Sequence, residues 1–172
     1  MAANEFVDRT LGADPGRIRF DGNEALRELL RAMTAQARRT LDFSSLQLEP
    51  GLLDDAYFVE SVRQLVLRSR RTQIRLLVIE PAALATRGHR LLDLAHQLPS
   101  FIALRVPGQH HKDYRESTLI ADNVGFVHRP LAERPKGLAD FSAPSQAQYL
   151  AQRFEEIWSA ARPSPHLRSL VL

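Results

Sequence analysis

The sequence predicts an α/β fold in which a mixed β-sheet of about six strands is sandwiched by helices. Short aliphatic segments of strand length alternate with segments whose apolar residues recur at every third or fourth position. Residues 74–79 are almost all aliphatic, which is typical of a strand buried on both faces. Right-handed crossovers between such strands place helices on both faces of the sheet.

The elements follow from local patterns. Asp21-Gly22-Asn23 offers a cap for the first helix, and Pro99 ends the third. Asp122 and Asn123 suit a tight turn between the last two strands, because both residue types tolerate a positive φ. The strands are expected near residues 17–20, 40–44, 73–79, 101–106, 117–122 and 124–128, and the helices near 24–39, 55–69, 89–97 and 145–161.

Length and turn-forming residues indicate the domain organisation. The 172 residues suit one domain. Residues 1–16 are polar and glycine-containing, and we expect a loose segment there, followed by a single domain at 17–172. Residues 130–144 are expected to form an irregular connection before the last helix. The residues expected in the core are Ile74, Leu76, Val78, Leu104 and Ile120.

Composition excludes several classes of protein. The chain has no cysteine, which excludes a disulfide scaffold, a thiolate metal site and a cysteine nucleophile. The N-terminal residues include acidic groups and no apolar run, so they do not form a secretory signal. Nowhere do about 18 apolar residues follow one another, so we expect no membrane insertion and a cytoplasmic protein.

The basic residues gather at the ends of two predicted helices. The totals of 23 basic and 20 acidic residues are balanced, and a nucleic-acid footprint would need the basic groups on one surface. Arg38 and Arg39 end the first helix, and Arg68, Arg70 and Arg71 end the second. Cations there offset the negative end of the helix dipole. Phosphate binding is the alternative interpretation, so a nucleic-acid partner stays open.

The order of elements before Asp122 carries a resemblance to a known family. A basic helix end leads into the strand at 73–79, a second helix ends at Leu98-Pro99, and the strand at 101–106 precedes one that ends on Asp122. This order resembles one half of a phospholipase D-type domain. The chain is also similar to a bacterial domain of unknown function that is associated with acetyltransferase-like proteins.

The resemblance implies a catalytic motif of His and Lys two residues apart, with Asp five positions after the Lys. Its His would form a phosphohistidine, its Lys would balance charge on the phosphoryl oxygens, and a paired half would complete the site. Here Arg115 stands in the His position, Ser117 in the Lys position, and Asp122 is retained. Of the Gly-Ser-x-Asn element that usually follows, Gly125 remains and His128 ends the segment. Arginine stays protonated and cannot attack phosphorus, so the motif reads as degenerate.

A second His-x-Lys pattern lies in the loop before the fifth strand. A phosphodiesterase or nuclease could use His110 or His111 with Lys112, although Ser117 then stands where the Asp is needed. The two His residues with Asp113 form a poor metal site, because adjacent side chains diverge and no second pair has ligand spacing. We therefore expect no metal and no cofactor.

Two further groups are candidates for ligand binding. Gly88, His89 and Arg90 begin a predicted helix whose free N–H groups could hold an anion, unless His89 packs against the sheet and Arg90 is solvated. Polar residues that follow the second and third strands should face a crevice at the carboxyl edge of the sheet. They are Ser44, Ser45 and Glu80.

The missing His and Lys decide between two functions. The sequence favours a non-catalytic phospholipase D-like domain that acts in binding or assembly in a bacterial cytoplasm. The alternative is a homodimeric phosphodiesterase or nuclease. We expect a homodimer in both cases, formed by the face near Arg115, Ser117 and His128, because the two halves of the family pack around the catalytic strand. A separate protein partner also stays open.

Overall fold

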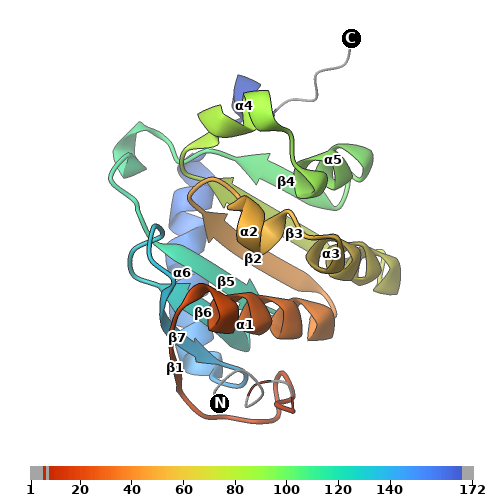
Figure 1. Ribbon diagram of the computed structural model, residues 1–172, viewed down its shortest axis with the longest axis vertical. Coiled ribbons are helices and arrows are strands. Elements are labelled where there is room, and N and C mark those ends of the chain that lie inside the picture. Colours follow the sequence, from red (N-terminus) through yellow and green to blue (C-terminus); the bar gives the residue numbers. More distant parts are fainter. Residues whose placement is uncertain (1–5, 7, 168–172) are drawn as a thin grey trace.

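The computed structural model describes residue 6 and residues 8–167, and a seven-stranded mixed sheet forms its centre (Figure 1). The order across the sheet is β1-β7-β6-β5-β2-β3-β4. Strands β2, β3 and β4 are mutually parallel, and β5, β6, β7 and β1 each run antiparallel to their neighbours. The bounds are β1 (Ile18–Asp21), β2 (Thr40–Ser45), β3 (Gln73–Val78), β4 (Ile102–Arg105), β5 (Ser117–Ala121), β6 (Gly125–Arg129) and β7 (Lys136–Asp140).

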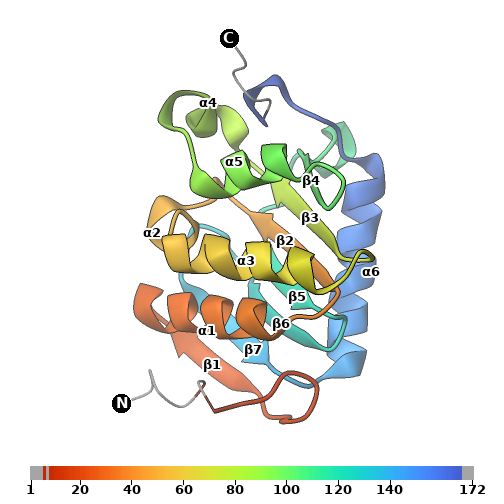
Figure 2. The same cartoon turned by 90° about the vertical axis from the view of Figure 1, so that its right-hand side faces the viewer.

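Helices cover both faces of the sheet (Figure 2). Helices α1 (Asn23–Gln36), α3 (Ala56–Arg68) and α5 (Arg90–Gln97) lie side by side on one face, and α6 (Pro144–Ala160) crosses the other. Short helices α2 (Pro50–Leu53) and α4 (Leu84–Arg87) and the 3₁₀ turns η2 (Pro81–Ala83), η3 (Gln109–His111) and η4 (Pro165–Leu167) lie in the connections. The predicted fold class is confirmed. No helix among the described residues has the length and apolar character needed to cross a membrane.

The core consists of two apolar layers separated by the sheet. Alternate residues of one strand enter different layers: Leu119 packs with α1 and α3, whereas Ile120 packs with α6. Leu104 is half-buried, because β4 is an edge strand. The other residues predicted for the core, Ile74, Leu76, Val78 and Ile120, are at most 2% exposed.

Strand β7 was not expected, since the sequence predicted an irregular connection over residues 130–144. Its five residues, Lys-Gly-Leu-Ala-Asp, are too polar to read as a strand. Pairing with β6 and β1 on its two sides satisfies its backbone nevertheless. At Gly137 an added Cβ would collide with the carbonyl oxygen of His128, so the close approach of these strands requires glycine.

The described part of the N-terminal segment is held against the domain. The side chain of Gln36 accepts a hydrogen bond from the Leu11 N–H (2.8 Å) and donates one to the Arg9 carbonyl (2.8 Å). The Gly12 N–H donates to the Phe141 carbonyl (2.7 Å). These contacts link the segment to α1 and to the loop after β7.

The direction of β5 places its two ends at opposite edges of the sheet. Because β5 is antiparallel to β2, its first residue, Ser117, lies where β2 and β3 end. We call this the carboxyl edge. Asp122 directly follows β5 and lies where β2 and β3 begin, which we call the amino edge. About 16 Å separates the two residues along an extended strand, at roughly 3.3 Å per residue.

Candidate functional site

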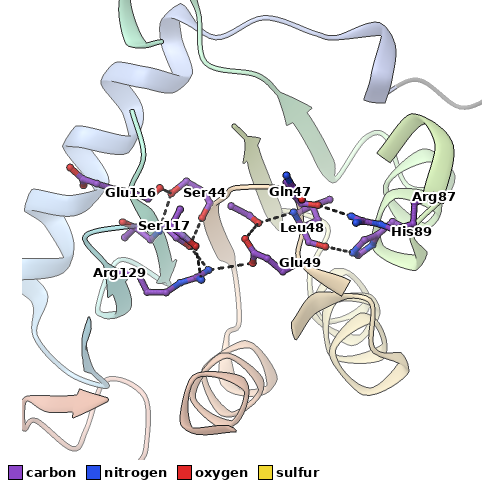
Figure 3. A network of polar contacts seen from close by, with 12 residues as sticks. Ser44, Gln47, Leu48, Glu49, Arg87, His89, Glu116, Ser117 and Arg129 are labelled. Carbon is purple, nitrogen blue, oxygen red and sulfur yellow. Dashed lines mark hydrogen bonds and ion pairs between the residues drawn. The ribbon is translucent and has the colours of Figure 1, made fainter. Parts of the chain in front are cut away.

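A buried polar network occupies the carboxyl edge around Ser117 (Figure 3). The Ser117 hydroxyl donates a hydrogen bond to the Ser44 carbonyl (2.7 Å) and accepts one from the Arg129 guanidinium (2.8 Å). Arg129 also donates to the Ala132 carbonyl (3.0 Å) and forms an ion pair with Glu49 (3.4 Å). Ser117 and Arg129 pair directly across the β5–β6 ladder. A guanidinium therefore lies beside the position that the resemblance assigns to the Lys of the motif.

Among the described residues, the buried cation Arg129 has one carboxylate partner, Glu49. Its side chain is 3% exposed, against 24% for Glu49. Burial lowers the pKa of Arg129, and the charge and hydrogen bond of Glu49 oppose that shift. Arginine stays protonated even so. With Asn23 and Arg27 of α1, the pair lines a cavity of about 350 Å³, so a polar ligand could approach this charge from the α1 side.

Ser44 is surrounded by hydrogen bonds that hold the start of β5. Its hydroxyl contacts the Tyr114 hydroxyl (3.1 Å), accepts from the Thr118 N–H (2.9 Å) and donates to the Glu116 carbonyl (3.2 Å). Burial raises the pKa of Tyr114, so its hydroxyl stays protonated. Within the described structure, no His or carboxylate contacts Ser44, so no general base activates it.

The loop after β2 brings Glu49 to Arg129 through an unusual backbone conformation at Leu48. Leu48 has a φ of 53°, which non-glycine residues seldom adopt. Its N–H donates to the Ser45 hydroxyl (2.9 Å), and its carbonyl accepts from Nε2 of His89 (2.8 Å). These two bonds hold the turn that aims Glu49 inward. Farther along the same edge, Gln47 donates to the exposed Glu80 (3.2 Å).

His89 is a buried residue that caps α5. Its Nδ1 accepts from the Leu91 N–H (3.0 Å) while Nε2 donates to Leu48, so the ring is neutral. Burial lowers the pKa of His89. The side chain of Arg90 is exposed, and its N–H donates to Asp54 (3.2 Å). Two N–H groups of this helix start thus have acceptors already, and the anion site at Gly88, His89 and Arg90 stays a prediction.

Asp122 at the amino edge has a different role from Ser117. Its carboxylate accepts three backbone hydrogen bonds, from the N–H groups of Arg38 (2.8 Å), Arg39 (2.8 Å) and Thr40 (3.0 Å). Asp122 and Asn123 have φ values of 52° and 57°, as expected for residues of a tight turn. Asp122 therefore joins the β5–β6 turn to the junction between α1 and β2.

The other residues named from the sequence lie outside the network around Ser117. The exposed Arg115 donates to two carbonyls of its own loop, those of Lys112 (3.0 Å) and Tyr114 (2.9 Å). His128 on β6 shares a hydrogen bond with the Thr118 hydroxyl (2.9 Å) on the α6 side of the sheet, and burial lowers its pKa. Gly125 pairs with Ala121 at the amino edge.

The loop with the second His-x-Lys pattern packs toward α6. His110 and His111 belong to η3 and line a cavity of about 240 Å³ together with Tyr114 and Arg153. Lys112 and Asp113 are exposed. In the described part of the chain, no hydrogen bond or ion pair joins either His to Ser117, and no group of three or more His, Asp or Glu side chains could hold a metal ion.

Arg129 and Glu49 are the site residues that sequence reasoning missed. The hairpin register holds the signal for Arg129, because a tight turn after β5 pairs Ser117 with a residue at the end of β6. Glu49 has no such signal, since its position depends on the turn at Leu48. Ser44, Ser45 and Ser117, which the sequence named, do meet here.

Comparisons with known proteins agree with this architecture. Residues 22–170 match the family described as Domain of unknown function (DUF7931). No curated protein matches the chain. Among solved structures, the chain is similar to Nuc of Salmonella typhimurium, a phospholipase D family member, with 13% identity and a TM-score of 0.60 over 87% of this chain and 97% of that one.

Two other structures show the same fold. NucT of Helicobacter pylori is 7% identical, with a TM-score of 0.61 over 88% of this chain and 100% of that one. TrmBL2, an archaeal chromatin protein with a novel mode of DNA binding, is 13% identical, with a TM-score of 0.62 over 88% of this chain and 54% of its own. These likenesses establish the fold.

Proposed function

This chain belongs to the family described as Domain of unknown function (DUF7931), and we propose that it is a non-catalytic phospholipase D-type domain that acts in binding or assembly. The observation that carries the proposal is the network around Ser117. A serine bonded to a buried arginine, itself paired with Glu49, fills the place where the resemblance calls for a lysine.

Phosphoryl transfer through a covalent intermediate needs a nucleophile with a lone pair and a cation that meets the developing charge. Arg115 has no lone pair to offer and faces its own loop. Arg129 carries a charge, but its nitrogens are bonded to Ser117, Ala132 and Glu49. The hydroxyl of Ser44 contacts no His or carboxylate of the described residues that could act as a base. The polar side chains at the carboxyl edge therefore form hydrogen bonds and an ion pair that stabilise the fold.

The position of Asp122 supports the same proposal. A carboxylate that accepts three backbone N–H groups stabilises the chain whether or not a reaction takes place elsewhere. Its retention is therefore compatible with a motif whose His and Lys positions have changed. A catalytic role is not needed to account for it.

A binding role has a parallel among proteins with this fold, since TrmBL2 is an archaeal chromatin protein that binds DNA. Assembly is the other part of the proposal. We propose a homodimer formed by the face near Arg115, Ser117 and His128, of which Arg115 is exposed, His128 is half-buried and Ser117 lies buried beneath them. A separate protein partner is the alternative form of assembly. Sedimentation at tens of micromolar, a range set by micromolar affinities of roughly −8 kcal/mol, tests the dimer. A strict monomer there removes it.

A hydrolysis assay tests the absence of catalysis. We expect the purified protein to leave bis(p-nitrophenyl) phosphate, phosphatidylcholine and plasmid DNA unchanged relative to buffer. Turnover that disappears in His110→Ala or His111→Ala but persists in the matched variant His96→Ala would contradict the proposal. That result would establish the loop pattern His110-His111-Lys112 as the working motif.

A further inference from the structure

An open groove of about 770 Å³ lies at the amino edge, beside the ends of α1 and α3. Its lining is mostly polar and basic and includes Gln36, Arg38, Arg39, Arg68 and Ser69. It lies at the opposite end of β5 from Ser117. Its lining residues are therefore different from those of the network around Ser117.

Strand pairing places a second arginine pair, Arg70-Arg71, on the connection next to Arg38-Arg39, beside Ser69 of the groove lining. Thr40, which begins β2, pairs with Gln73, which begins β3, and the Gln73 N–H donates to the Arg39 carbonyl (3.0 Å). Arg38-Arg39 directly precede β2, and Arg70-Arg71 lie just before β3. Neighbouring strands are roughly 4.8 Å apart, so the two arginine pairs lie on adjacent connections.

A direct hydrogen bond to a helix end is formed by Arg68 and, within the described residues, by none of the other four arginine side chains. Arg68 donates to the carbonyls of Ala35 (3.0 Å) and Ala37, so it caps the C-terminus of α1. The side chains of Arg38, Arg39, Arg70 and Arg71 are exposed, and within the described residues none of them has a hydrogen-bond or ion-pair partner. Four guanidinium groups thus face solvent at one edge.

Asp122 is the one carboxylate among the residues that line the groove, and its single charge offsets only one of the four guanidinium charges. Asp122 lines the groove, but both of its oxygens accept backbone N–H groups of residues 38–40. Four like charges on adjacent connections repel one another, and a bound polyanion removes that repulsion. The groove is therefore suited to a ligand with several regularly spaced negative charges.

We infer that this groove binds the phosphate backbone of double-stranded nucleic acid, without reading its sequence. None of the residues that line it is aromatic. It therefore offers no platform for the unpaired bases of a single strand and no aromatic anchor of the kind that dominates protein interfaces. Arginine side chains with nearby Thr, Ser and Gln groups are the usual donors to phosphate oxygens.

The test is binding of a short labelled DNA duplex of mixed sequence, followed by fluorescence anisotropy over a series of salt concentrations. The variant Arg38→Gln/Arg39→Gln/Arg70→Gln/Arg71→Gln should bind at least about tenfold more weakly at low salt. The slope of log K against log salt should fall by up to about 3.6, at roughly 0.9 per phosphate contact. Because these side chains have no described partners and repel one another, we expect the unfolding temperature of the variant not to fall.

A matched variant separates the groove from net charge. Arg17→Gln/Arg19→Gln/Arg134→Gln/Arg162→Gln removes four exposed arginines elsewhere, so both variants change the net charge from +3 to −1 (3 − 4). The matched variant should keep the salt slope of the wild-type protein. Equal losses of duplex affinity in both variants would overturn the inference. Tighter binding of single strands than of duplex, or displacement of the duplex by poly-glutamate at equal charge, would also overturn it. So would the absence of duplex binding by the wild-type protein at low salt. Arg→Lys at the four positions should preserve binding.

Discussion

The two ends of β5 hold polar residues in different ways. At the amino edge, the half-buried Asp122 bonds to backbone N–H groups. At the carboxyl edge, Ser117 is 2% exposed and depends on the side chains of Arg129 and Glu49. Backbone N–H groups are present whatever the neighbouring residues are, whereas a side-chain network requires its members to change together. The polar contacts at the amino edge therefore depend on one side chain, Asp122. Those at the carboxyl edge depend on several side chains together.

The sharpest way to break this comparison is to return a lysine to the carboxyl edge. Ser117→Lys places a second cation against the buried Arg129, whose ion-pair partner among the described residues is Glu49. An unpaired buried charge is among the few changes that lower the free energy of unfolding by about 4 kcal/mol or more. Urea unfolding measures the loss.

The swap Ser117→Lys/Arg129→Ser is the control for that prediction. It keeps one cation and one hydroxyl in the network, so it should recover more than half of the lost unfolding free energy. If the single variant unfolds at the same urea concentration as the wild-type protein, the site tolerates two cations. The closed network would then not describe the carboxyl edge.

The amino edge should respond to a single substitution. Asp122→Ala removes the acceptor of three N–H groups and places alanine at a φ of 52°. We expect the free energy of unfolding to fall by about 3 kcal/mol, at roughly 1–1.5 kcal/mol for each of these partly solvated hydrogen bonds. Asp122→Asn keeps one acceptor oxygen and tolerates the turn, so it should lose about half as much. A loss well below about 1 kcal/mol in Asp122→Ala would mean that the hydrogen bonds do not stabilise the junction.

Sequence reasoning located the amino edge better than the carboxyl edge, for a physical reason. Asp122 and Asn123 mark their turn through local conformational preference, which depends on no distant residue. Arg129 is brought to Ser117 by the register between β5 and β6. The expected Gly-Ser-x-Asn element pointed instead to Gly125, at the other end of β6. Glu49 is placed by the positive φ of Leu48, for which the sequence has no signal.

The same distinction applies to the fold. The sequence predicted five elements within a few residues of their bounds: β3 and the amphipathic helices α1, α3, α5 and α6. In these elements the spacing of apolar residues marks the buried face. Strand β7 was missed because its side chains are largely polar and it is stabilised by backbone pairing with β6 and β1. Long-range pairing thus accounts for what the sequence left open in both the sheet and the site.

A smaller effect is expected from the ion pair at the carboxyl edge. Glu49→Gln leaves Arg129 without a carboxylate partner and should lower the free energy of unfolding by about 1–2 kcal/mol, below the usual 3–5 because the contact is 3.4 Å long and Glu49 is 24% exposed. Arg129→Met removes the donor to Ser117, Ala132 and Glu49, so it should lower the free energy of unfolding by a similar amount. The double variant should then lose no more than Arg129→Met alone. Additive losses would mean that the two side chains are not coupled.

The smallest expected effect is a dependence of the free energy of unfolding on pH through His89, which bonds to the turn that positions Glu49. His89 is neutral in the folded protein because Nδ1 accepts the Leu91 N–H, and burial lowers its pKa. As pH falls below the ordinary His pKa of about 6.5, the unfolded chain takes up a proton that folded His89 resists. The free energy of unfolding should therefore be fully retained above about pH 7 and should decline from about pH 6.5 downward, toward the lowered pKa.

His89→Asn keeps a helix cap but cannot titrate, so its decline should be shallower, with the remaining part due to His128. Parallel declines in wild-type and His89→Asn protein, measured by urea unfolding from about pH 7 to about pH 5, would mean that His89 accepts a proton as readily in the folded chain as in the unfolded one.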